Sequence, residues 1–397
     1  MREEAAEVRR FAREGVNVRQ ARRRVHGLGA MLLTAAVLVG AAETGAAGQE
    51  SIPVGDAPTF LVFDQRARLV LVVNVRGNSI SVIDAASRMV VRTVPVGALP
   101  HHLALNSRTG RSYVADWGSD TVSILEPGGV SVRSIHVGEA RSGPLTVAVS
   151  RATGRVFVAN ALENSVSILG VGNAWSRAVP VGTDPHPMVV DEQYGLVYVG
   201  NALSDDLTVL DVDTGAVIKT VRVGEKPMGI VVDRYRSRVF VSNSGTDTVS
   251  VLTSPGADVI ATITVGLLPR ALALDARAAR LYVANYGGSS VSLVNAASLR
   301  ISATASIGRN PLALALDRRR GRLYVANGGD DTVSVLDAAS LEVLATMPVG
   351  RLPHALVIEP RSGCVFVANA ASNSVSVIAC EAASQSAAIT RFASARR

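Results

Sequence analysis

Aromatic residues are scarce in this sequence: Phe, Trp and Tyr make up 4% of 397 residues, whereas hydrophobic residues as a whole make up 48%. The apolar share is supplied mainly by Val, Ala and Leu, and 35 Gly accompany it. Small and β-branched side chains favour strands over a helical bundle. A chain of this length ordinarily contains two or three domains, but a single repeat that fills the chain would instead form one domain.

Lysine is almost absent, since Lys219 and Lys226 are the only two. The formal net charge of +7 therefore comes from Arg, and the first 47 residues, with eight Arg and five Glu, hold +3 of it. Such a bias can follow genome composition as much as function. The basic balance is therefore not evidence for a nucleic-acid partner.

The longest apolar run, Gly27 to Ala42, is too short to span a membrane comfortably. It follows Arg22-Arg23-Arg24 and leads into the small residues around Ala46-Ala47-Gly48. This order is typical of a secretory signal peptide, so residues 1–48 are expected to be a leader and the mature chain to be periplasmic or secreted without a transmembrane span. An uncleaved anchor is the alternative, and the polar residues before Arg22 suggest a start codon further downstream.

A tetrad of the Tyr-Val-Ala-Asn kind recurs eight times beyond the leader, with spacings of 42, 44, 41, 42, 42, 42 and 42 residues. A period in the low forties with four strand-like runs per unit indicates a β-propeller blade. The tetrads end at Asn74, Asp116, Asn160, Asn201, Asn243, Asn285, Asn327 and Asn369. A small polar residue follows each of them by four positions: Asn78, Asp120, Asn164, Asp205, Asp247, Ser289, Asp331 and Asn373.

One unit shows the expected strands, A to D, at residues 312–317, 323–326, 332–337 and 343–349. Gly, Asn and Asp separate them, as tight antiparallel turns require. Strand B has no polar alternation, so both of its faces are expected to be covered by neighbouring blades.

The two ends of the repeat region complement each other. Eight Val-Gly or Ile-Gly pairs end D strands, but the first such strand, Ile52 to Val54, precedes any A strand, and the last A-B-C set has none after it. Pairing of the first strand with the last set would leave no open sheet edge. We therefore predict one propeller of eight four-stranded blades over residues 49–380, followed by a flexible tail at 381–397. A seven-bladed ring with one unit outside it is the alternative.

The tetrads carry a family resemblance. Leu281-Tyr282-Val283-Ala284-Asn285, with copies at 323–327 and 365–369, resembles the YVTN-type (WD40/YVTN-like) propeller repeat. The resemblance covers about residues 51–380 and implies an all-β propeller. Relatives of this repeat include surface-layer proteins, lactonase-like enzymes and propellers of redox enzymes such as nitrite and nitrous oxide reductases, so it implies no single activity.

Cysteine is limited to Cys364 and Cys380, and no Cys-based metal or redox motif exists. The two residues stand at the start of strand B and the end of strand C in the last unit, and their midpoint falls in the turn between those strands. The two sulfurs are therefore expected to face each other, and we predict a disulfide in an oxidising compartment. Two buried thiols are the alternative.

Strand connectivity places the D–A and B–C loops on one face. His101, His186 and His354 are expected around the channel mouth there. Their three imidazoles could bind copper or zinc, or act as acid and base. Bonds of about 2 Å to a metal need convergence, however, and opposite sides of a wide channel do not provide it. No cofactor is therefore predicted, and a ligand-lining role is favoured. The position after the D–A Pro is occupied in turn by Thr59, His101, Leu145, His186, Met228, Arg270, Leu312 and His354.

The B–C loops on this face vary most, and variable loops on a regular scaffold are where binding usually takes place. They supply Arg76, Trp117 and Tyr286 as further candidate ligand contacts. Carboxylates that a lactonase-like metal site would need are scattered over the D–A loops, which argues against that activity.

The opposite face holds 16 Arg in its A–B loops. Like charges on a rim concentrate polyanions, so an anionic surface is a possible partner. Pairing with the acid that ends most A strands is the alternative use of these residues. Aromatic residues on this rim are limited to Tyr194 and Tyr235, so specific nucleic-acid binding is not expected. The candidate contacts are Arg234, Arg236, Arg238, Arg318, Arg319 and Arg320.

The sequence thus predicts an exported, monomeric β-propeller that binds a protein or small ligand on the D–A and B–C face, and does not favour an enzyme. Two alternatives stay open. One is a channel-site enzyme or redox-linked protein that uses His101, His186 and His354. The other is a polyanion-binding scaffold that uses the Arg rim.

Overall fold

The structure is a computed structural model that describes residues 50–380, except for 131, 140 and 171–174. These residues all belong to one compact unit, Gly45–Arg397. The predicted leader and the predicted C-terminal tail lie outside the described residues.

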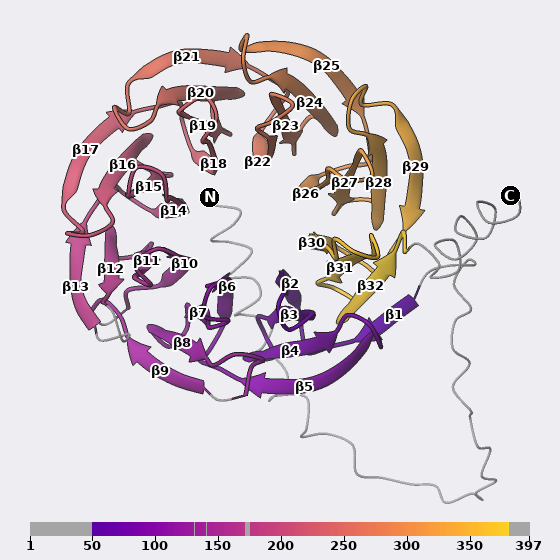
Figure 1. The fold of residues 1–397 in the computed structure, drawn as a ribbon, viewed down its shortest axis with the longest axis horizontal. Coiled ribbons are helices and arrows are strands. Elements are labelled where there is room, and N and C mark those ends of the chain that lie inside the picture. Colours follow the sequence, from indigo (N-terminus) through magenta and orange to yellow (C-terminus); the bar gives the residue numbers. More distant parts are fainter. Residues whose placement is uncertain (1–49, 131, 140, 171–174, 381–397) are drawn as a thin grey trace, which may run out of the picture. The chain divides into compact units, whose positions relative to one another are not determined.

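The described residues form eight four-stranded antiparallel sheets, here called blades 1 to 8, arranged in a ring (Figure 1). In every blade strand A is innermost and strand D outermost. Blades 1 to 4 consist of β2 (Pro58–Asp64), β3 (Leu69–Asn74), β4 (Ser79–Asp84), β5 (Met89–Pro95); β6 (Pro100–Leu105), β7 (Ser112–Asp116), β8 (Thr121–Leu125), β9 (Val132–His136); β10 (Pro144–Val149), β11 (Val156–Asn160), β12 (Ser165–Leu169), β13 (Trp175–Pro180); and β14 (Pro185–Asp191), β15 (Leu196–Asn201), β16 (Asp206–Asp211), β17 (Val217–Arg222). Blades 5 to 8 consist of β18 (Pro227–Asp233), β19 (Arg238–Asn243), β20 (Thr248–Thr253), β21 (Val259–Thr264); β22 (Pro269–Asp275), β23 (Arg280–Asn285), β24 (Ser290–Asn295), β25 (Arg300–Ser306); β26 (Pro311–Asp317), β27 (Arg322–Asn327), β28 (Thr332–Asp337), β29 (Val343–Pro348); and β30 (Pro353–Ile358), β31 (Val365–Asn369), β32 (Ser374–Ile378), β1 (Glu50–Pro53).

The hydrophobic core lies between blades. One buried cluster joins Phe366 and Val375 of blade 8 to Leu61 and Val70 of blade 1. Strand B is buried along almost its whole length, as in β31, which confirms that neighbouring blades cover both of its faces. Strand A is half-buried, because one of its edges borders the channel, and strand D is mostly exposed.

The ring closes through its first strand. β1 pairs antiparallel with β32, from Glu50 opposite Val377 to Pro53 opposite Ser374, and Ile52 is buried there. This confirms the eight-bladed propeller and its predicted closure, and it excludes the seven-bladed alternative.

The recurring Asn and Gly of the motif form a buried cradle at one end of each blade. Asn285 donates from Nδ2 to Ser290 Oγ and to Ser292 Oγ, both at 3.0 Å. Gly266 lies directly against that Asn, since a Cβ on it would stand 2.5 Å from Asn285 Cγ. Gly follows the Val at the end of strand D because there is room for only a hydrogen atom beside the tetrad Asn.

The small polar residue after each tetrad connects neighbouring blades. All eight adopt positive φ, from 46° to 57°, which Asn and Asp tolerate better than most residues. The side chains of seven of them, the Asn and Asp residues, also accept from the next D–A loop: Leu352 N donates to Asp331 Oδ1 at 2.8 Å, and across the closure Ala57 N donates to Asn373 Oδ1 at 2.9 Å.

Cys364 and Cys380 form a disulfide with their Cα atoms 4.1 Å apart. It joins the residue before β31 to a residue just after β32, at the end of blade 8 where the other blades have a C–D turn. Among the described residues, no helix is long and apolar enough to cross a membrane.

Candidate functional site

The channel has two mouths with different loops. At one, here called the D–A mouth, the D–A and B–C loops are joined by main-chain hydrogen bonds, such as Val75 N to Ala57 O at 2.9 Å. At the other, here called the A–B mouth, the loops between strands A and B meet. The sequence predicted ligand binding first at the D–A mouth.

The predicted His and Arg positions lie at the starts of inner strands around the D–A mouth, and all are half-buried. His354 Nδ1 lies 2.8 Å from the carbonyl oxygen of Thr59, to which it donates. Arg270 stands over the ring of Tyr286, with its Cζ 5.8 Å from the ring centroid. The structure therefore brings Arg270 and Tyr286 together.

The three imidazoles do not gather into a metal centre. Within the parts of residues 50–380 that the structure describes, no group of three or more His, Cys, Asp or Glu side chains could hold a metal ion. His101, His186 and His354 come from blades 2, 4 and 8, so they are spread around the ring.

His102 is packed into the wall of blade 2. Its ring centroid lies 4.2 Å from that of Phe60. Burial, with a smaller contribution from nearby His186, lowers the pKa of His102 to about 4, so the ring is neutral at pH 7. His102 is therefore a neutral, partly buried residue that packs in the wall of the channel.

Charges on the B–C loops are largely paired within the protein. Arg76 forms an ion pair with Asp56 at 3.2 Å, and Asp330 forms one with Arg309 at 2.5 Å. Trp117 is half-buried. The predicted contacts at this mouth are thus mostly engaged in loop structure.

The A–B mouth is built differently. The polar residue that closes strand A is an acid in six blades, Asn106 in blade 2 and Ser150 in blade 3. It accepts main-chain N–H groups of its own loop, as Asp64 Oδ1 does from Arg66 N at 2.9 Å. The carboxylate fixes the turn, and the side chains that follow it project outward. Seven of the eight blades carry Arg at the first or second position after this polar residue, and these are Arg66, Arg108, Arg151, Arg234, Arg277, Arg318 and Arg361, with Arg319 beside Arg318. Here they are called the Arg ring.

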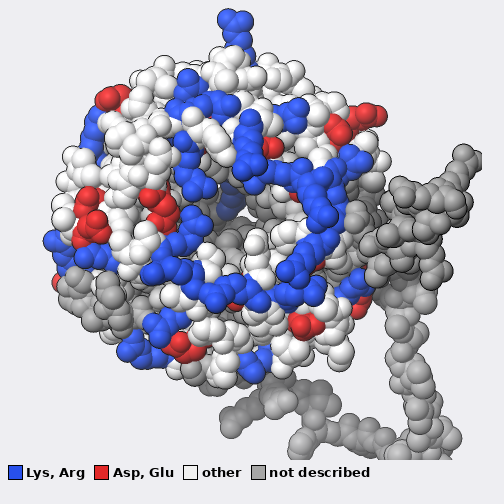
Figure 2. Space-filling model, in the orientation of Figure 1, with Lys and Arg blue, Asp and Glu red and all other residues white. Residues whose placement is uncertain are grey.

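Figure 2 shows basic side chains gathered in a band around the hollowed channel mouth. The exception in sequence is blade 4, where Glu192 takes the place of Arg. Glu192 lies 3.8 Å from Arg151 Nε and also accepts from main-chain groups of the neighbouring loop. Of the predicted rim, Arg234, Arg318 and Arg319 are exposed and belong to this ring.

The other three predicted rim residues are held in structural contacts. Arg236 pairs with Asp233 at 3.0 Å, and Arg320 pairs with Asp317 at 3.0 Å. Arg238 donates to the carbonyl oxygen of Ala296 in the next blade at 2.7 Å. Half of the predicted rim therefore serves the scaffold. The sequence-based candidates came from the A–B loops richest in Arg, so Arg151 and Arg277 were not among them. A comparison of the same position in every A–B loop would have found both.

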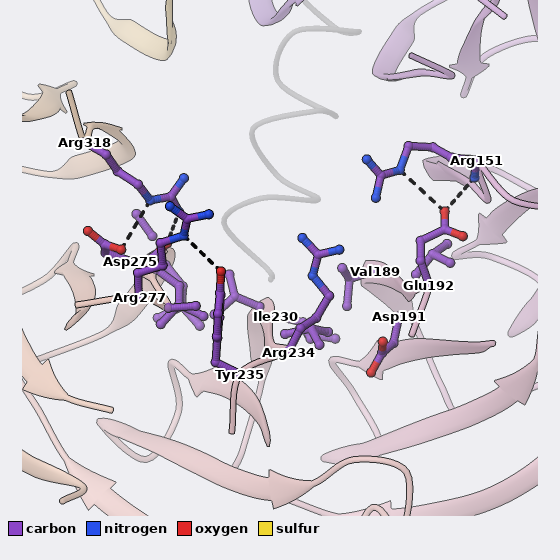
Figure 3. Close-up of a pocket in the computed structure, with 17 residues that line it drawn as sticks. Arg151, Val189, Asp191, Glu192, Ile230, Arg234, Tyr235, Asp275, Arg277 and Arg318 are labelled. Carbon is purple, nitrogen blue, oxygen red and sulfur yellow. Dashed lines mark hydrogen bonds and ion pairs between the residues drawn. The ribbon is translucent and has the colours of Figure 1, made fainter. Parts of the chain in front are cut away.

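A cavity of about 670 Å³ lies at the A–B mouth along blades 4 to 6. Its wall is aliphatic and comes from three adjacent inner strands, β14, β18 and β22. Arg151, Arg234, Arg277 and Arg318 line its rim, together with Tyr235 and the acids Glu192 and Asp275 (Figure 3). This cavity could not be predicted from the sequence, because the half-buried inner strands have similar sequences in all blades.

Comparisons with known proteins support the fold. A family model described as a YNCE-like beta-propeller matches residues 133–311. No curated protein matches the sequence.

Similar solved structures include a streptogramin B lyase, at 12% identity and TM-score 0.57 over 71% of this chain and 93% of that one. Virginiamycin B lyase from Staphylococcus aureus is similar at 12% identity and TM-score 0.57, over 71% of this chain and 95% of that one. Dihydro-heme d1 dehydrogenase NirN is similar at 16% identity and TM-score 0.65, over 74% of this chain and 66% of that one. Identities at this level support a shared fold and not a shared activity.

Proposed function

The chain is a YVTN-like β-propeller, and from that premise we propose that it is an anion-binding scaffold whose ligand docks on the Arg ring of the A–B mouth. The Arg ring itself carries the proposal. Seven of the eight blades, whose loops otherwise vary, carry Arg at one of the same two positions of the A–B loop around one opening.

A ring of like charges raises the local concentration of anions, and guanidinium groups bind carboxylate, phosphate and sulfate groups in two-pronged geometry. Holding these cations together costs self-repulsion, and an anionic ligand relieves it. Export to the periplasm or beyond is part of the proposal, on the composition of the leader, and would expose the ring to anionic surfaces and polymers outside the cytoplasm.

Retention of the purified chain on heparin, measured against NaCl concentration, tests this function. We expect retention to fall with salt, and Arg66→Gln, Arg108→Gln and Arg361→Gln together to reduce the slope by about 0.7–0.9 for each lost contact, as for phosphate contacts. Arg92→Gln, Arg222→Gln and Arg351→Gln remove the same charge from exposed sites outside the ring and form the matched control. Equal loss in both triple variants would show that only net charge matters and would refute the site.

The D–A mouth is a second candidate for ligand binding. Arg270 over Tyr286 is the observation that favours it, since the pair places a cation and an aromatic ring together at a channel opening. Loss of ligand affinity in Tyr286→Ala, with affinity unchanged in the Arg ring variant, would move the site to this mouth.

A further inference from the structure

The cavity at the A–B mouth has an apolar wall. Val189, Ile230, Val231 and Leu272 contribute to it, and all four are only partly buried. A volume of about 670 Å³ is within the range of about 300–1,000 Å³ typical of small-molecule sites. Aliphatic surface in contact with channel water favours an apolar ligand, because binding would remove that surface from water.

Two of the four rim cations are neutralised within the protein. Arg151 faces Glu192 at 3.8 Å, and Arg318 Nε faces Asp275 at 3.5 Å. Asp191, the third acid of the lining, is buried and accepts from Ser254 Oγ at 2.7 Å. Among the described residues, none of the three acids forms an ion pair with the remaining two cations.

Arg234 and Arg277 are those two cations. Arg277 Nε donates to the hydroxyl of Tyr235 at 2.9 Å, a neutral partner. The Arg234 side chain makes no ion pair or hydrogen bond with any described residue, and in Figure 3 it stands between the Arg277–Tyr235 pair and the Arg151–Glu192 pair. A compact anion placed here would meet two guanidinium groups without an ion pair, on the rim of a cavity with an aliphatic wall.

We infer that this cavity binds an amphipathic anion, with a carboxylate at Arg234 and Arg277 and an unbranched aliphatic chain along β14, β18 and β22. The inference rests on the proposed anion-binding function and names the class of ligand for one sector of the Arg ring. Glu192 of blade 4 pairs with Arg151, so the head group is assigned to Arg234 and Arg277 and not to Arg151.

A series of alkyl carboxylates tests the apolar part on the unaltered full chain. Calorimetric titration with octanoate, decanoate and dodecanoate, below their micelle concentrations, is expected to show affinity rising about twofold to fourfold for each added methylene. Dodecyltrimethylammonium, with the same chain and the opposite charge, is the control and is expected to bind at least tenfold more weakly than dodecanoate. Affinity independent of chain length, or equal binding of the cation, would overturn the inference.

Arginine variants test the head group. Arg234→Gln is expected to weaken dodecanoate binding about tenfold and Arg277→Gln by a similar factor, whereas Arg361→Gln, at the loop position equivalent to Arg277 in blade 8, should change it less than twofold. Arg234→Gln disturbs no described contact, so its folding is not at risk. Equal effects of Arg234→Gln and Arg361→Gln would show that the ring acts only through its overall field.

The two proposals fail separately. Heparin retention without any preference for longer carboxylates would overturn the amphipathic ligand and leave the anion scaffold standing. Absence of both heparin retention and dodecanoate binding would overturn both.

Discussion

The two mouths of the channel use polar residues in opposite ways. At the D–A mouth the recurring polar groups form hydrogen bonds within the scaffold. Asn285 is fully buried, and Asp331 accepts a hydrogen bond from a main-chain N–H of the next blade. At the A–B mouth the acid at the end of strand A fixes the turn, and the following Arg side chains are left outside it. The most regular part of the repeat therefore builds the fold, and the less regular loop opposite it is free to carry function.

The largest effect that would sharpen this contrast is expected at Asp116, the one acid among eight equivalent tetrad positions of the D–A end. Burial is the main cause of the rise in its pKa to about 6. The hydrogen bonds that it accepts from Ser123 and Thr121 lower the pKa and offset part of this rise. The folded protein therefore holds the proton more tightly than the unfolded chain, and stability falls as the pH rises between about 4 and 6. At pH 7 the loss approaches about 3 kcal/mol, at about 1.4 kcal/mol for each unit.

Asp116→Asn should remove this pH dependence, leaving stability at pH 3.5 nearly unchanged and raising it at pH 7, as measured by urea denaturation. Asn160→Asp in the next blade is the reciprocal variant and should introduce the same decline between pH 4 and 6. A wild-type stability that is flat over this interval would contradict the prediction.

The disulfide gives the next test. It lies at the A–B end of blade 8, where a covalent bond, and not the buried Asn of the D–A end, joins the strands. Cys364→Ser with Cys380→Ser should lower the free energy of unfolding by about 2–3 kcal/mol, as expected for a closed loop of this length. Thermal denaturation of the oxidised protein, with and without reductant, gives the same comparison, and reductant should leave the double variant unaffected. An equal shift by reductant in both proteins would argue against the linkage.

Gly266→Ala tests whether the D–A cradle is as tight as its geometry indicates. The added Cβ would meet Asn285, which its hydrogen bonds hold in place, so we expect a loss of about 1–3 kcal/mol. Gly321→Ala in an A–B loop has open space around it and pays only for its positive φ of 63°, about 1 kcal/mol. Chemical denaturation compares the two, and a smaller loss at Gly266 than at Gly321 would refute the tight cradle.

The smallest effect is expected in the Arg ring. Arg234→Gln and Arg361→Gln should change the free energy of unfolding by less than about 0.5 kcal/mol, because neither side chain contributes to the core. The same denaturation measurement checks this, at low and at high salt. A loss above 1 kcal/mol would mean that the ring is structural, and the contrast between the mouths would disappear.

The fold was predictable from the sequence because the same repeat occurs eight times. The position of each Gly, each tetrad Asn and the unmatched first strand follows from spacing alone, and the blade number and closure could be counted. The free cations could not be identified in this way, since Arg236 and Arg238 donate to carbonyl oxygens of residues 40 and 58 positions further along, in the next blade. Which charge stays free depends on contacts between blades, and local spacing does not reveal these contacts.

The pairing of β1 with β32 has a consequence for the topology of the chain. Because Glu50 lies opposite Val377, the two ends of the described propeller are neighbours in one sheet, and the seam is only one of eight equivalent places where the backbone can be interrupted. A circular permutant that joins these ends by a short linker and opens a C–D turn of another blade would keep every strand pair and both mouths. The order of blades along the chain is thus separable from their arrangement in the ring.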